Sequence, residues 1–116
     1  MEFLSQLLLI PALAAPIFIG MGIISKTFPP KHINSVYGYR TSRSMKSQER
    51  WNFAQTYSAN EMIKLGSLVL LTSLFGLALN LSEELEIALG FGLMIAMVVV
   101  FVIRTEKAIQ NKFEKE

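Results

Sequence analysis

Apolar residues are gathered into three long runs, and polar residues fill the segments between them. The first run covers 3–24 without a charged residue, the second covers 62–81, and the third covers 85–103. A helix needs about 20 mostly apolar residues to cross the hydrocarbon core of a bilayer. The pattern predicts an all-α integral membrane protein with three transmembrane helices, in which residues 1–116 form a single membrane domain.

The lengths of the connecting segments set the order of packing. Only "SEE", residues 82–84, separates the second run from the third. We therefore expect these two spans to form a tight antiparallel hairpin. The segment 26–61 between the first two spans is long and polar, and a polar tail, 104–116, follows the third span.

The charges are segregated along this topology. All 11 Lys and Arg residues belong to the loop 26–61, to Lys64 at the start of the second span, or to the tail 104–116. With three spans, loop and tail lie on one side of the membrane, whereas the N-terminus and residues 82–84 lie on the other. The positive-inside rule predicts that loop and tail are cytoplasmic and that the N-terminus is outside. The chain begins Met1-Glu2-Phe3 without a cation, so we expect a retained span and not a cleaved signal peptide.

A further helix is expected inside the loop. Ser47 is a favourable N-cap, and neither Pro nor Gly interrupts the chain from Gln48 to Leu65. At about 100 degrees per residue, Trp51, Ser58 and Met62 share one face. This pattern predicts a cytoplasmic amphipathic helix between spans one and two, which lies at the headgroup level with Trp51 as interfacial anchor and either bends at the membrane or continues into the second span.

The amino-acid composition limits which kinds of functional site the chain can form. Apolar residues make up 52% of the chain, more than a small soluble domain buries, so the excess is expected to face lipid or partners. The sequence has no Cys, no Asp and one His, His32, which excludes disulfides and thiolate sites and leaves few ligands for zinc or iron. We therefore predict no catalytic, cofactor-binding or metal site. No ionisable residue lies in the middle of a span, which argues against an ion-coupled carrier.

Small residues recur at four-residue spacing in two of the spans. They are Thr72, Gly76 and Asn80 in the second span and Ala88, Gly92 and Ala96 in the third. Such stripes let helix backbones approach closely. We expect them at the seam of the bundle or at the seam of a homo-oligomer.

The loop carries a cluster of cations interleaved with aromatic residues. The cations are Arg40, Arg43, Lys46 and Arg50, and the aromatic residues are Tyr37, Tyr39, Trp51 and Phe53. This composition suits nucleic-acid binding, but no nucleic-acid-binding fold fits a short loop held at both ends by membrane helices. Attraction to the anionic headgroups of membrane lipids explains the charges. A small membrane enzyme acting on lipid phosphate headgroups is an alternative, in which Arg40, Arg43 and Lys46 grip phosphate and Glu49 is the base. A second alternative is a structural subunit of a larger membrane complex.

One motif in the loop is more specific than its charge. It consists of Asn34, "YGYRT" at 37–41, Ser44-Met45-Lys46, Glu49, Trp51 and Ala54-Gln55. The motif closely resembles that of the SdpI family of small bacterial membrane proteins. The resemblance covers roughly 33–55, and the layout of spans agrees over most of the chain. Ser42 stands where the family pattern has Pro, and Gln55 stands where it has Asn.

The resemblance implies an immunity role in the bacterial cytoplasmic (inner) membrane. Such proteins protect a producing cell from a secreted toxic peptide, and the namesake also signals by holding a repressor at the membrane. The resemblance therefore implies a toxic peptide and a cytoplasmic regulator as partners. The residues that it marks for partner binding are Asn34, Tyr37, Gly38, Tyr39, Arg40, Thr41, Lys46, Glu49, Trp51 and Gln55.

Two of these residues carry a physical expectation of their own. Arg40 offers five N–H donors, so it can pair bidentately with Glu49 or with a lipid phosphate. The pairing with Glu49 would fix the loop onto the start of the following helix. Gly38 is expected to meet a requirement of the backbone and not to contact a partner.

Overall fold

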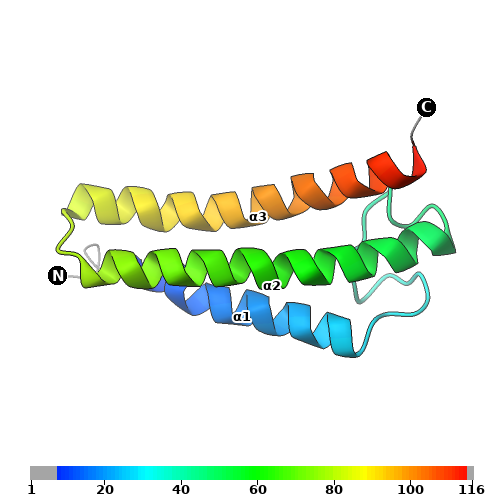
Figure 1. Cartoon of the computed structure of the whole chain (residues 1–116), viewed down its shortest axis with the longest axis horizontal. Coiled ribbons are helices and arrows are strands. Elements are labelled where there is room, and N and C mark those ends of the chain that lie inside the picture. The colour runs from blue at the N-terminus through cyan, green and yellow to red at the C-terminus, as the bar shows by residue number, and fades with distance from the viewer. Residues whose placement is uncertain (1–7, 115–116) are drawn as a thin grey trace.

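The computed structural model describes residues 8–114 and contains three helices, α1 (Leu9–Thr27), α2 (Gln48–Ala78) and α3 (Glu83–Phe113). In Figure 1 α2 lies between α1 and α3, and α1 and α3 touch each other least. All three helices are long and apolar enough to cross a membrane. Within residues 8–114 the prediction of an all-helical protein with three helices able to span a membrane is therefore confirmed. The first residues of the span predicted at 3–24 lie outside the described part.

The bundle has two chemically different ends, which we name by the connections that they hold. The hairpin end holds residues 79–82, which join α2 to the antiparallel α3, and the start of α1. The loop end holds residues 28–47 and the last turns of α3, at the right of Figure 1. At about 1.5 Å per residue, the 31-residue α2 is about 46 Å long and exceeds a hydrocarbon core of about 30 Å.

The helix predicted inside the loop is the first part of α2. Its N-cap is confirmed, since the Ser47 hydroxyl accepts a hydrogen bond from the Arg50 N–H at 3.1 Å. The helix then continues to Ala78 without a break, as in the alternative that it continues into the second span. A separate cytoplasmic amphipathic helix is not supported. Trp51, Ser58 and Met62 do share a face, but this face is buried within the protein and does not lie on the headgroups.

Glycines on α1 and α2 bring these two helices together. A Cβ atom on Gly22 would lie 2.8 Å from the Ala59 carbonyl oxygen, and one on Gly66 would lie 2.6 Å from Ile19 Cγ1. The backbones therefore approach too closely for larger residues. The small-residue stripe predicted on α3 does not form such a seam: Gly92 is exposed, with no atom within 4 Å of an added Cβ.

A buried carboxylate from α3 accepts a hydrogen bond from the backbone at the start of α1, at the hairpin end. Leu8, the N-cap of α1, has no side-chain cap of its own, and its N–H donates to Glu86 Oε1 of α3 at 3.4 Å. Glu86 is buried. A carboxylate at this position satisfies a free N–H and complements the positive end of the helix dipole. Glu86 therefore helps to fix the start of α1 against α3.

Candidate functional site

The loop end is an ordered cap and not a flexible connection. It begins with a turn at Asn34, whose side-chain oxygen accepts hydrogen bonds from the N–H groups of Val36 at 2.8 Å and Tyr37 at 2.7 Å. The Tyr37 hydroxyl donates to the Phe28 carbonyl at 2.9 Å. Asn side chains commonly form such turns because they hydrogen-bond to the backbone nearby. Two motif residues therefore shape the path of the chain.

Gly38 and Gln55 form the next part of the cap. Gly38 has φ of 112°, which confirms that the backbone requires glycine here. Tyr39, the residue that follows Gly38, is held by the buried side-chain amide of Gln55. This amide accepts a hydrogen bond from the Tyr39 N–H at 2.7 Å and donates one to the Tyr39 carbonyl at 2.9 Å. Gln55 thus attaches the loop to α2. This role uses both ends of the side-chain amide.

Trp51 lies beneath this part of the loop. Its side chain is fully buried, and its indole N–H donates to the Pro30 carbonyl at 2.6 Å. The prediction of an interfacial anchor is therefore wrong, because an anchor of that kind would present its ring to the headgroups. Trp51 instead closes the loop over the first turns of α2.

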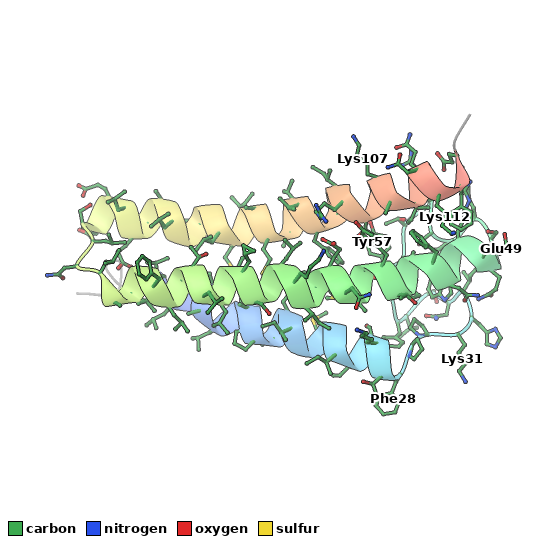
Figure 2. The ribbon with its side chains drawn as sticks, viewed as in Figure 1. Phe28, Lys31, Glu49, Tyr57, Lys107 and Lys112 are labelled. Carbon is green, nitrogen blue, oxygen red and sulfur yellow. The ribbon has the colours of Figure 1, made fainter. Side chains whose placement is uncertain are left out.

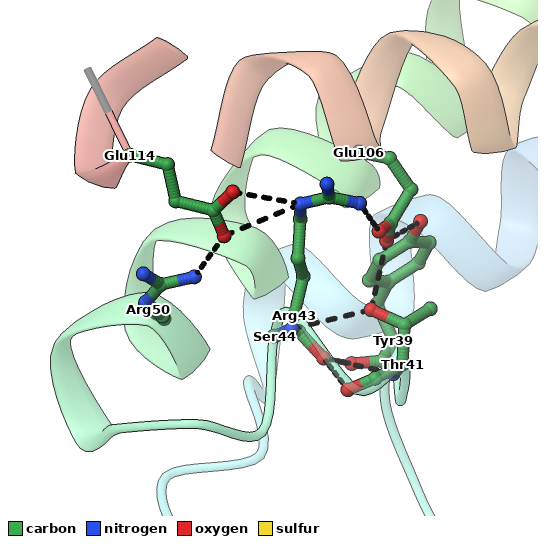
Figure 3. Close-up of polar contacts among 7 residues, drawn as sticks. All are labelled: Tyr39, Thr41, Arg43, Ser44, Arg50, Glu106 and Glu114. Carbon is green, nitrogen blue, oxygen red and sulfur yellow. Dashed lines mark hydrogen bonds and ion pairs between the residues drawn. The ribbon is translucent and has the colours of Figure 1, made fainter. Parts of the chain in front are cut away.

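Glu106 of α3 is the acceptor at the centre of the cap. Its Oε2 atom accepts hydrogen bonds from the hydroxyls of Tyr39 and Thr41, each at 2.7 Å, and its Oε1 atom lies 3.3 Å from Arg43 Nη1 (Figure 3). Burial alone would raise the pKa of Glu106, but these donors outweigh burial and lower it below the ordinary value. Burial, followed by the bond to this carboxylate, raises the pKa of Tyr39. The acid is therefore ionised and the phenol neutral at physiological pH.

A second carboxylate extends the network to the end of α3. Arg43 Nε lies 3.3 Å from Glu114, and Arg50 Nη1 lies 2.7 Å from the same carboxylate. The pKa of Glu114 is lowered, mainly by the bond from Arg50. The sequence prediction missed both acids. Acids among the cations of the tail were the available signal that the tail folds back onto the loop.

The fully buried Ser44 closes the turn that carries Arg43. Its single hydroxyl proton is shared between the Tyr39 and Thr41 carbonyls, at 3.0 and 3.1 Å from Oγ, and the oxygen accepts from the Thr41 N–H at 2.9 Å. These bonds hold the segment between Tyr39 and Arg43 in the shape that reaches Glu106. Ser44 was part of the recognised motif, and its role is local.

A separate ion pair joins α2 to α3 nearer the middle of the bundle. Glu61 is buried, and its carboxylate accepts from Arg104 Nε at 2.7 Å and Nη2 at 3.2 Å. Lys64 Nζ lies 3.2 Å from Glu61. Burial would raise the pKa of Glu61, but both cations counteract it and the net shift is downward. Sequence reasoning did not pair Glu61 with Arg104.

Three charged residues of the motif face outward. Arg40, Lys46 and Glu49 are exposed, and within residues 8–114 none of them makes a hydrogen bond or an ion pair through its side chain. Figure 2 shows Glu49 at the tip of the loop end. The expected pairing of Arg40 with Glu49 is therefore absent. Arg43 performs the anchoring instead, through Glu106 and Glu114.

One of the residues expected to grip phosphate in a headgroup enzyme is engaged elsewhere. Arg43, one of its three phosphate ligands, is committed to Glu106 and Glu114. Across the described residues, no three His or Glu side chains lie close enough together to hold a metal ion. The arrangement provides a hydrogen-bonded cap with outward-facing charges.

Comparison with known proteins gives two matches. A sequence profile of the SdpI/YfhL protein family matches residues 31–111, which include most of the loop, all of α2 and most of α3. A protein of Bacillus subtilis (strain 168), the uncharacterized protein YfhL, is 47% identical over 89 residues, which are 77% of this chain and 76% of that protein. No solved structure matches the chain.

Proposed function

Because the chain belongs to the SdpI/YfhL family, we propose that it protects a bacterial cell from a membrane-active toxic peptide. The proposed location is the cytoplasmic membrane, with the loop end inside and the hairpin end outside. The position of all 11 Lys and Arg residues supports this orientation. The three long apolar helices support a multi-pass membrane protein.

The observation that carries the proposal is the division of the motif into an inner and an outer part. Trp51 and Gln55 are buried and, with Tyr39 and Thr41, hold the loop on α2 and α3. Arg40 and Lys46 point to solvent from the cap that these residues hold rigid. A rigid surface with unengaged cations suits docking of a soluble cytoplasmic regulator that has an acidic surface.

Charges at the hairpin end support contact with the toxic peptide. Glu83 and Glu84 are exposed there, next to the turn at 79–82. An acidic surface outside the membrane attracts a cationic peptide at long range. We infer that peptide contact and regulator docking use opposite ends of the bundle.

The test is survival and membrane potential of a sensitive bacterium exposed to a panel of membrane-active toxic peptides. Matched cultures express the wild type, Arg40→Ala, Lys107→Ala or no protein. Lys107 is the control because it is also an exposed cation at the loop end but lies outside the motif. We expect the wild type and Lys107→Ala to protect against at least one peptide.

The Arg40→Ala culture distinguishes regulator docking at the loop end from peptide contact at the hairpin end. If Arg40→Ala protects fully but no longer co-purifies a soluble regulator from membranes, Arg40 acts in signalling. If Arg40→Ala loses both the protection and the regulator, Arg40 belongs to the immunity mechanism itself. Absence of protection by the wild type across the whole panel would overturn the immunity function.

A further inference from the structure

An apolar cleft lies at the loop end where α1 and α3 separate. Its volume is about 470 Å³, within the range of about 300–1,000 Å³ that is usual for small-molecule sites. Residues of all three helices line it, and Tyr37, Gly38 and Tyr39 of the loop form its polar edge. The lining is mostly apolar, with Phe18 and Phe101 in edge-to-face contact.

The cleft lies at the depth where hydrocarbon meets headgroups. Met62 and Val102 line it; Met62 is the first residue of the second apolar run, and Val102 lies one residue before the loop-side end of the third. It also opens to the surface of the bundle, since Val98 is 49% exposed and Ile24 is 55% exposed. In a bilayer this opening faces acyl chains, which are the apolar groups available at that depth.

Two exposed cations are next in sequence to residues that line the cleft. Lys26 directly follows Ser25, and Arg40 directly follows Tyr39, and both of these neighbours line the cleft. Consecutive Cα atoms are about 3.8 Å apart, so the two cations begin within one residue of the lining. Both are exposed, and neither forms an ion pair within residues 8–114. Cations at this depth attract the phosphate of an anionic lipid.

We propose that this cleft binds one acyl chain of an anionic phospholipid whose phosphate meets Lys26 and Arg40. A peptide helix fits less well: with a diameter of about 10 Å and a pitch of about 5.4 Å, one turn fills about 420 Å³. The cleft would therefore hold about one turn. The lipid site goes beyond the proposed immunity function and does not depend on it, although both proposals use Arg40: a bound phosphate would occupy this cation when no regulator is docked.

The protein contains its own reporter of this site. Trp51 is the single tryptophan of the chain, and a Cβ on the cleft-lining Gly38 would lie 3.2 Å from its Cζ2 atom. The full chain is reconstituted in phosphatidylcholine vesicles that contain a fixed fraction of lipid with brominated acyl chains. The brominated lipid is either phosphatidylglycerol or phosphatidylcholine, and quenching of Trp51 fluorescence is measured. We expect about twofold stronger quenching by brominated phosphatidylglycerol.

Variants distinguish the cleft from the rest of the lipid-facing surface. Val98→Phe fills the cleft, whereas Val99→Phe adds the same ring at a neighbouring, similarly exposed position of α3 that does not line it. We expect Val98→Phe to reduce quenching by both lipids and Val99→Phe to leave it unchanged. The double variant Lys26→Gln/Arg40→Gln should keep quenching but lose the preference for phosphatidylglycerol.

Three results would overturn the proposal. Equal quenching of the wild type, Val98→Phe and Val99→Phe would mean that no acyl chain enters the cleft. Equal quenching by the two brominated lipids in the wild type would remove headgroup selection. A fall in quenching as the protein-to-lipid ratio rises would identify a second copy of the chain as the occupant.

Discussion

Glu106 is the residue on which the position of the loop depends most directly. Three donors from three different loop residues, Tyr39, Thr41 and Arg43, converge on its carboxylate. A hydrogen bond to a charged group typically contributes about 1.5–3 kcal/mol, and the contributions within one network are not additive. Loss of the negative charge therefore weakens all three contacts together.

We predict that stability at the loop end falls in acid because of this carboxylate. Its folded-state pKa is lower than the ordinary value of 4.5, so its contribution is complete above that value and is lost as the pH falls through the folded-state pKa. Emission of Trp51, measured from pH 7 down to pH 3, should shift to the red as the cap opens. Glu106→Gln should show part of that shift already at pH 7 and a flatter pH dependence.

A protease readout gives an independent check at neutral pH. Arg40, Arg43 and Lys46 are trypsin sites within the loop. Glu106→Gln should be cut there several-fold faster than the wild type, whereas Lys107→Gln should be cut at the wild-type rate. Equal rates for all three proteins would show that Glu106 does not hold the loop.

Gly38 carries the second prediction at the residue scale. Its φ of 112° strains any L side chain, and an added Cβ would lie 2.7 Å from Gln55 Oε1 and 2.8 Å from Pro30 Cγ. We expect Gly38→Ala to destabilise the fold by about 1–3 kcal/mol. The control is Gly92→Ala on α3, where no atom lies within 4 Å and the helix should gain about 0.5–1 kcal/mol. Thermal unfolding in mild detergent measures both; similar melting temperatures for the two variants would contradict the strain at Gly38.

At the scale of the helices, Glu61 and Arg104 tie α2 to α3 one residue outside the second and third apolar runs. The pair is asymmetric, because the Glu61 side chain is only 3% exposed whereas the Arg104 side chain is 49% exposed. A buried carboxylate that loses its partner keeps its desolvation cost, whereas an exposed guanidinium is solvated by water. Mutation of Glu61 and mutation of Arg104 are therefore expected to change the stability of the protein by different amounts.

We predict that Arg104→Gln destabilises the protein more than Glu61→Gln does. The first change leaves Glu61 with Lys64 as its remaining cation and should cost about 1–3 kcal/mol. The second change should cost less than about 1 kcal/mol, since it neutralises the buried group. The double variant should resemble Glu61→Gln. Equal losses for the two single variants, measured by denaturant titration in micelles, would argue against the asymmetry.

At the scale of the whole molecule, the loop end gathers the cations and the hairpin end gathers exposed acids. We predict that these ends lie on opposite sides of the bacterial membrane, with the loop end inside. The chain has no native cysteine, so single cysteines can be introduced cleanly. Ser82→Cys should react with a membrane-impermeant maleimide in intact cells, whereas Ser42→Cys should react only after lysis. The reverse pattern would invert the topology.

Long-range pairing explains which parts of the fold were predictable. Runs of apolar residues report directly on membrane-spanning helices, and Ser47 and Gly38 act on their own backbone, so both could be identified locally. The partners of Trp51 and Arg43 lie 21 and 63–71 residues away. A single sequence gives no register between such distant segments, so Trp51 resembled an interfacial anchor and Arg43 a cation for lipid phosphate.

The sequence by itself determined the three spans, the segregation of charge and the family, because each depends on composition or on a contiguous motif. Only the tertiary structure decided that α2 is continuous, that Glu106 receives the loop, and that Arg40 and Lys46 remain outside the network. The physical reason is that exposure and pairing depend on which surfaces meet. In this protein those surfaces come from the loop and from the far end of α3, which are brought together only when the bundle folds.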